Sequence, residues 1–185
     1  MGTLEDYAHI LDFLPQGLTA ERQFKREPLA YALGEIEFKL FELVPKPNLQ
    51  IGIGERVYIG KEADKRDRIA HVKRRVSYEE LTAAAHSELP FVVQDVVKQN
   101  EARFTQFYND AQAITTRFHM LELLPGLGKK TMWAIIEERK KGPFKSFVDI
   151  ATRIPSFKHP EKVIAKRIEM ELSDPTQKYH IFVSR

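Results

Sequence analysis

The chain contains no cysteine, which excludes disulfides, thiol nucleophiles and cysteine-ligated zinc. It also lacks any apolar run close to the roughly 18 residues that a membrane helix needs, and Met1 to Ile10 have neither the positive start nor the apolar stretch of a signal peptide. We therefore expect a cytoplasmic protein without a membrane partner. Its 185 residues, 43% of them hydrophobic, are enough to bury one large core or two small ones.

Signatures of catalysis and cofactor binding are also scarce. The glycine-rich stretch at 51–61 has Val57 where a dinucleotide fingerprint needs its third glycine, and Glu62 where a phosphate loop needs Ser or Thr. The carboxylates are scattered, so no acid–base pair can be nominated. No metal-ligand spacing relates the six histidines, which stand at positions 9, 71, 86, 119, 159 and 180. The sequence thus predicts a protein that is not an enzyme and has no cofactor or metal.

Positive charge is distributed unevenly. Residues 1–115 carry 15 Lys and Arg against 18 Asp and Glu, whereas residues 116–185 carry 14 against 8. Such asymmetry favours a surface for polyanions on the C-terminal part. The alternative is a solvated, salt-bridged face with no ligand.

The first third of the sequence predicts β-structure. Runs at 35–44, 56–60 and 68–76 are β-like, and in the last one Ala70, Val72 and Val76 alternate with His71, Lys73 and Arg75. Short strands separated by Pro and Gly indicate a small, strongly bent sheet or barrel, for which the oligonucleotide-binding (OB) type is one candidate.

The remainder predicts helices. Ser77 with Glu80 forms a capping-box pattern, and apolar residues with helical spacing follow, first at 104–111 and then in helices predicted at 115–124, 129–141, 147–154 and from Pro160. We expect Trp133 to be buried, and His119 with Glu122 to be an exposed helical pair. The overall prediction is an α+β protein with a β-rich, OB-like domain (1–76), a connecting helical segment (77–115) and a helical domain (116–185).

The most specific motif joins the helices predicted at 115–124 and 129–141. It consists of Leu124 and Pro125 followed by Gly126, Leu127, Gly128, Lys129, Lys130 and Thr131. Together with the later Gly142-Pro143-Phe144, Asp149 and Arg153, this closely resembles the helix-hairpin-helix motif of proteins that bind nucleic acid without sequence specificity. Met132 departs from the pattern, which commonly has a small residue there.

The residue types themselves suit phosphate binding. Glycines at 126 and 128 let a sugar-phosphate chain approach the backbone, and a helix starting near Lys129 presents free N–H groups and the positive end of its dipole. Lys129 and Lys130 add charge, and Thr131 adds a hydroxyl. Because none of these groups reads a base edge, binding through this element should have little sequence preference. A turn used only for packing is the alternative.

Two further features support a polyanion partner. Aligning Pro125 with Pro155 gives a partial repeat with a period of 30 residues, in which Ser156 and Lys158 replace the two glycines and Lys158 becomes a binding candidate. A second basic cluster at 61–75 includes Lys73, Arg74 and Arg75, which we also take as binding candidates. A solvated loop is the alternative interpretation of this cluster.

The layout as a whole looks like an archaeal family of predicted RNA-binding proteins whose function is not established. This resemblance implies an RNA-related role around ribosomes or RNA processing, with RNA favoured over DNA, and supplies no catalytic residue. Three other classes stay open: a DNA-binding repair or recombination accessory, an enzyme acting on nucleic acid with carboxylates that only the fold brings together, and a protein-interaction module.

Overall fold

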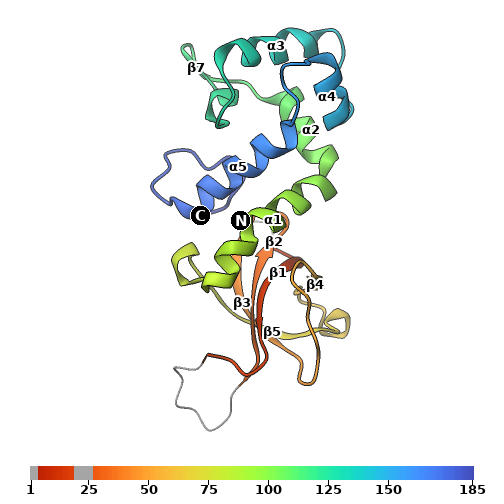
Figure 1. Cartoon of the computed structure of the whole chain (residues 1–185), viewed down its shortest axis with the longest axis vertical. Coiled ribbons are helices and arrows are strands. Elements are labelled where there is room, and N and C mark those ends of the chain that lie inside the picture. Colours follow the sequence, from red (N-terminus) through yellow and green to blue (C-terminus); the bar gives the residue numbers. More distant parts are fainter. Residues whose placement is uncertain (1–3, 19–26) are drawn as a thin grey trace. The chain divides into compact units, whose positions relative to one another are not determined.

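The computed structural model describes residues 4–18 and 27–185, and it divides into two compact units (Figure 1). Residues 1–92 and 171–185 form the first, here called the sheet unit, and residues 93–170 form the second, the helical unit. The fold is α+β, as predicted. Helices α1 (Ala83–Gln99) and α5 (Pro160–Ser173) each contain a boundary between the units.

The sheet unit is built on one curled antiparallel sheet of five strands in the order β4-β1-β2-β3-β5. The strands are β1 (Tyr7–Leu14), β2 (Leu29–Gly34), β3 (Leu40–Pro45), β4 (Arg56–Tyr58) and β5 (Ile69–Arg75). The last three correspond to the predicted runs, although β3 begins five residues later than expected. The first two strands were not predicted.

The core of this unit lies inside the curl. Both edge strands contribute to it, β4 through Val57 and β5 through Ile69, beside Ala8, Ala30 and Ala32 of the central strands. Small side chains in the middle of a concave face leave room for the sheet to bend. Near the edges, Arg68 Nη2 lies 3.0 Å from Glu55 Oε1, so a salt bridge joins the segments that precede β4 and β5.

Strand β5 corrects the predicted alternation. Ala70 is exposed and Ile69 is fully buried in its place. The cause is the register with β3, where Pro45 pairs with Ile69 and Val44 pairs with His71, so that Ala70 has no opposite residue. One extra residue in a strand turns the side chains that follow it to the other face.

Residues 171–185 also belong to the sheet unit, which differs from the predicted domain boundaries. Ser184 donates its backbone N–H to the Glu37 carbonyl at 3.0 Å. The buried Glu171 carboxylate accepts the backbone N–H groups of Phe182 and Val183, at 3.1 and 3.0 Å. These contacts join residues distant in sequence, so the local pattern of residue types gives no sign of them.

The helical unit contains α2 (Glu101–Asp110), a short hairpin of β6 (Ala113–Thr115) and β7 (Phe118–His119), and the 3-10 helix η3 (Met120–Leu123). They are followed by α3 (Lys129–Lys140) and α4 (Phe147–Arg153). Its core consists of fully buried side chains from every helix, among them Phe104, Tyr108, Leu121, Ile135, Ile150, Ile164 and Ile168. The expected apolar stripes of α2, α4 and α5 are therefore confirmed.

Three predictions for this unit are wrong. The segment at 115–124 is not an α-helix, because His119 caps a single 3-10 turn: its Nδ1 accepts the Leu121 N–H at 3.0 Å, and its own N–H donates to Glu122 at 2.7 Å. The pair expected to be an exposed helical pair is thus a helix cap. Trp133 is 57% exposed instead of buried, since Met132 and Ile135 form the buried face of α3.

Candidate nucleic-acid interface

The segment Leu124–Thr131, here called the 124–131 turn, reverses the chain between η3 and α3. Leu124 and Leu127 are buried, and the Leu127 N–H donates to the Leu124 carbonyl at 3.3 Å. Gly126 has a φ of +77°, a conformation that favours glycine. The first helical bond follows at once, from the Met132 N–H to the Gly128 carbonyl at 3.0 Å. The turn is thus anchored by its leucines, with Gly126 between them and Gly128 between Leu127 and the helix.

Space is open on the glycine side of the turn. A Cβ added to Gly126 or Gly128 would meet no heavy atom within 4 Å. Gly128 is the N-cap of α3 in ordinary extended geometry, with a φ of −76°, so Ser or Asp would fit there and would be the usual choice. Gly128 makes no side-chain cap hydrogen bond and the first turn of α3 holds no acid, so α3 itself places no negative side chain at the positive end of its dipole.

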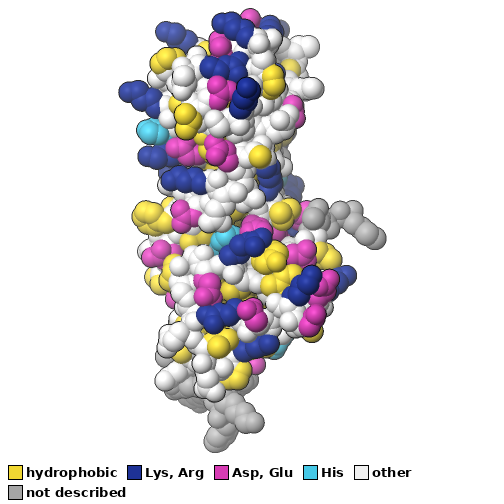
Figure 2. All heavy atoms as spheres, turned by 90° about the vertical axis from the view of Figure 1, so that its right-hand side faces the viewer, with side chains coloured by type: hydrophobic (Ala, Val, Ile, Leu, Met, Phe, Trp, Pro, Cys, Tyr) yellow, Lys and Arg dark blue, Asp and Glu magenta, His cyan; other side chains and the backbone are white. Residues whose placement is uncertain are grey.

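Lys129 and Lys130 are exposed at this helix start, and Thr131 is half-buried beside them. Within the described part of the chain, neither lysine forms an ion pair. At the other end of α3, Lys140 lies 2.9 Å from Glu137 and Lys141 lies 3.0 Å from Glu138. Figure 2 shows Lys and Arg side chains over the helical unit, interleaved with Asp and Glu. Two adjacent lysines without an ion pair thus stand at the start of α3, whereas the two lysines at its end are paired.

The loop at 154–159 reproduces part of this geometry, as the partial repeat predicted. Ile154 and Phe157 are buried, and the Phe157 N–H donates to the Ile154 carbonyl at 2.9 Å, matching Leu124 and Leu127. Lys158 is exposed and lines a shallow groove of about 530 Å³ together with Lys98. The helix that follows starts with Pro160, which has no N–H to offer.

The basic residues of β5 are engaged within the fold. Lys73 Nζ lies 3.5 Å from Glu42, and Arg74 lies 3.1 Å from Glu42 and 3.0 Å from Glu80. The guanidinium of Arg75 donates to the carbonyls of Ser184 and Arg185 at 2.8 and 3.3 Å. The structure does not present these three predicted site residues as free charges, although their side chains are partly exposed.

Two residues noted beside the turn motif are also structural. Arg153 donates to the carbonyls of Gly142 and Pro143 at 2.7 and 3.2 Å, and its guanidinium lies 4.4 Å from the centroid of the Phe144 ring. Asp149 accepts the Lys145 N–H at 2.9 Å. This hydrogen bond and, to a smaller extent, the one from Arg153 lower the pKa of the Asp149 carboxyl group. Together they hold the connection between α3 and α4.

A charge cluster around the buried carboxylate of Glu35 joins the strands of the sheet unit. Arg56 donates to both oxygens of Glu35, at 2.9 and 2.8 Å, and His9 Nε2 lies 2.9 Å from Glu35 Oε2. The hydrogen bonds from Arg56, and secondarily the one from His9, lower the pKa of Glu35. With both oxygens occupied, the carboxylate serves to hold β1, β4 and the turn after β2 together.

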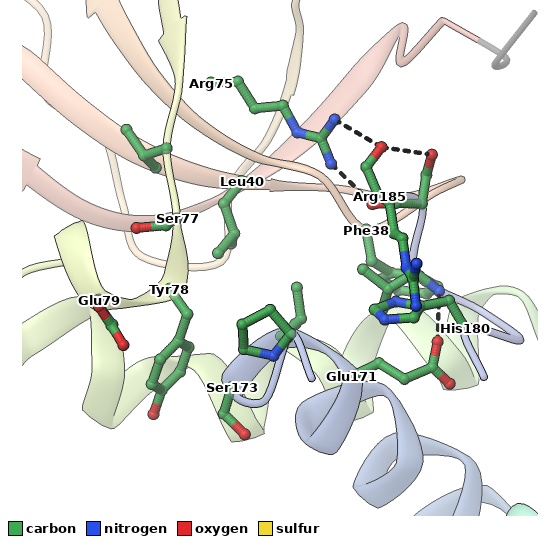
Figure 3. A pocket seen from close by; sticks show the side chains of 15 residues that line it. Phe38, Leu40, Arg75, Ser77, Tyr78, Glu79, Glu171, Ser173, His180 and Arg185 are labelled. Carbon is green, nitrogen blue, oxygen red and sulfur yellow. Dashed lines mark hydrogen bonds between the residues drawn. The ribbon is translucent and has the colours of Figure 1, made fainter. Parts of the chain in front are cut away.

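The sheet unit also contains a pocket of about 480 Å³ that the sequence did not reveal (Figure 3). Phe38, His180 and Arg185 lie on one side of it, opposite Ser77 and Tyr78. Neither ring nitrogen of His180 has a hydrogen-bond partner among the described residues. The pocket forms because the C-terminal residues fold back onto β3 and β5, a long-range arrangement with no local motif.

No group of three or more His, Cys, Asp or Glu side chains is arranged to hold a metal ion in residues 4–18 and 27–185. None of the helices in the same residues combines the length and the apolar character that crossing a membrane requires.

Comparison with known proteins assigns this α+β architecture to a family. Residues 4–184 match the family model "Protein of unknown function (DUF655)", so the chain belongs to the DUF655 family. Uncharacterized protein MJ0038 of Methanocaldococcus jannaschii is 52% identical over 180 residues, covering 97% of this chain and 80% of that protein. The crystal structure of the DUF655 protein Af1531 from Archaeoglobus fulgidus is 49% identical with a TM-score of 0.90, covering 97% of this chain and 100% of that chain. The predicted kinship with an archaeal family is confirmed.

Proposed function

We propose that the protein binds nucleic acid, RNA in preference to DNA, by holding backbone phosphates at the 124–131 turn, which we interpret as a helix-hairpin-helix motif. The start of α3 carries this proposal: it has no cap and no acid, two unpaired lysines, and glycines with open space beside them. Helix starts of this kind bind phosphate through N–H groups and dipole. Contacts of this type do not depend on base sequence.

The remaining parts of the proposal follow from the resemblance to archaeal predicted RNA-binding proteins. It supports the preference for RNA, a cytoplasmic location and partners among ribosomal or RNA-processing components, with no catalytic step and no cofactor. We also propose an OB-like character for the curled five-stranded sheet, because OB-folds are five-stranded, partly open barrels. In this proposal Lys158, Lys73, Arg74 and Arg75 form secondary contacts, weakened in β5 by their internal partners.

The first prediction concerns Lys129 and Lys130. Replacing both by alanine should weaken binding of a labelled single-stranded RNA and flatten the plot of log affinity against log salt by about 1.4, because each phosphate contact to a single strand adds about 0.7. Fluorescence anisotropy at several KCl concentrations measures both quantities. Circular dichroism verifies that α3 is retained.

The matched control is the Lys73→Ala/Arg74→Ala variant, which removes the same formal charge from the sheet unit. We expect it to reduce the slope by less than half as much, since both side chains are paired with Glu42. An equal reduction of the salt slope in the two double variants would refute a site centred on the turn. A clear preference for matched duplex DNA over RNA would support the DNA-binding alternative instead.

A further inference from the structure

Trp133 is a large aromatic side chain on the surface of α3. It is 57% exposed, while Met132 and Ile135 on either side of it are 5% and 0% exposed. Position 133 therefore points away from the buried face of the helix. Single exposed hydrophobic residues are common on protein surfaces, but tryptophan is enriched at binding interfaces, so the neighbours of Trp133 decide whether it has such a role.

The position of Trp133 relates it to the lysines of the turn. It stands four residues after Lys129 and three after Lys130, which are the spacings of neighbours on a helix surface, with Cβ atoms about 5–6 Å apart. Helical side chains lean toward the N-terminus, so the indole leans toward the turn. Next on this face is Glu137, which is paired with Lys140 at 2.9 Å. Positive charge thus adjoins the indole on the side of the turn.

We propose that Trp133 stacks on an unpaired base of the nucleic acid whose phosphate the turn holds, so that the ligand class is single-stranded RNA. This inference rests on the proposed function. Paired bases are stacked on one another and hide their faces, whereas bases in loops and single strands are free to stack on aromatic side chains. Every base has such a face, so the contact adds affinity without sequence preference.

The test uses the fact that Trp133 is the sole tryptophan of the chain, which makes intrinsic tryptophan fluorescence a reporter of this residue alone. Titration with single-stranded oligoadenylate should quench the fluorescence, while an abasic strand of equal length should not. Trp133→Ala should weaken oligoadenylate binding about 5- to 100-fold and leave the salt slope unchanged, because no charge is removed. Trp133→Phe should restore part of the affinity.

Phe91→Ala is the matched control, since Phe91 is an exposed aromatic residue of α1, at 65% exposure; it should bind as the wild type does. One outcome separates the two proposals: Trp133→Ala binds oligoadenylate normally, the wild-type fluorescence is not quenched, and the Lys129/Lys130 variant still has a reduced salt slope. The stacking inference then fails and the proposed function stands. If the wild type binds no RNA, the proposed function itself fails. Equal quenching by the abasic strand, or equal loss of duplex RNA binding in Trp133→Ala, would also overturn the inference.

Discussion

The two basic regions of the chain look alike in sequence and differ in structure. In the segment 61–75 of the sheet unit, Arg68, Lys73 and Arg74 are paired with glutamates that stand outside the segment. At the 124–131 turn, no described carboxylate pairs with Lys129 or Lys130. Counting charges along a sequence therefore measures how much positive charge is present, and only the fold decides how much of it is available to a ligand.

The starts of α3 and α4 give the same lesson for backbone groups. Helix α4 begins with Ser146, whose hydroxyl accepts the Asp149 N–H at 2.9 Å, and it has an acid in its first turn. Helix α3 begins with Gly128 and has neither feature. Glycine in place of Ser at an N-cap typically costs a helix only about a few tenths of a kcal/mol. Gly128 therefore keeps a capping side chain away from the first N–H groups of α3 at little cost in stability, and in the proposed function a phosphate takes that place.

The largest effect on stability is expected at Arg153 of the helical unit. Like Lys73 and Arg74 of the sheet unit, this cation is bonded to groups within the fold. Arg153→Ala should lower the free energy of unfolding by about 2–4 kcal/mol, because the carbonyls of Gly142 and Pro143 lose their charged donor. Urea denaturation followed by circular dichroism measures the change. Arg117→Ala, which removes an exposed arginine from the same unit, should change stability little. If the two variants lowered the free energy of unfolding equally, Arg153 would not differ from an exposed arginine, and the comparison between internal and available cations would fail.

A smaller effect is expected at Glu35. Glu35→Gln should destabilise the protein by about 1–3 kcal/mol at neutral pH, since it removes a charged acceptor from Arg56. The pKa of Glu35 is lower in the folded state, so its contribution is present above the unfolded pKa of about 4.3 and is lost as the pH falls through the folded value. The difference in the free energy of unfolding between wild type and Glu35→Gln should therefore shrink in acid. Glu79→Gln, at an exposed position, should show no such pH dependence, and a constant difference for Glu35→Gln would contradict the linkage.

The sequence predicted elements whose signals are local. The buried residues of α5 repeat with helical spacing, and Ser77 with Glu80 forms the expected capping box, because both features depend on residues within one or two turns. The prediction failed where distant groups decide. Strand β2 is buried along its whole length, so it lacks the alternation that marks a half-buried strand. Trp133 flanks the helical stripe that contains Met132 and Ile135, and at the edge of a stripe the spacing of residues does not decide whether a side chain is buried.

For the candidate site, the sequence located the turn but misjudged its surroundings. Gly126 and Gly128 interrupt a helical pattern, and such an interruption is visible without a structure. Whether Lys73, Arg74 and Arg75 are free depends on their pairing with Glu42 and with the C-terminal carbonyls. Those partners lie between 31 and 110 residues away along the chain, beyond the reach of any local pattern.

The smallest effect is expected at Lys158. Lys158→Ala should reduce the salt slope of RNA binding by at most about 0.7, the value for one phosphate contact to a single strand. The loop at 154–159 has the buried anchors of the 124–131 turn but lacks its glycines, and the proline that starts α5 provides no N–H to a phosphate. Anisotropy titrations at several salt concentrations measure the change. Lys162→Ala, which removes an exposed lysine of α5, should alter the slope less than Lys158→Ala does. If the two variants lose equal slope, the second loop contributes only diffuse charge, and phosphate binding in the helical unit is confined to the start of α3.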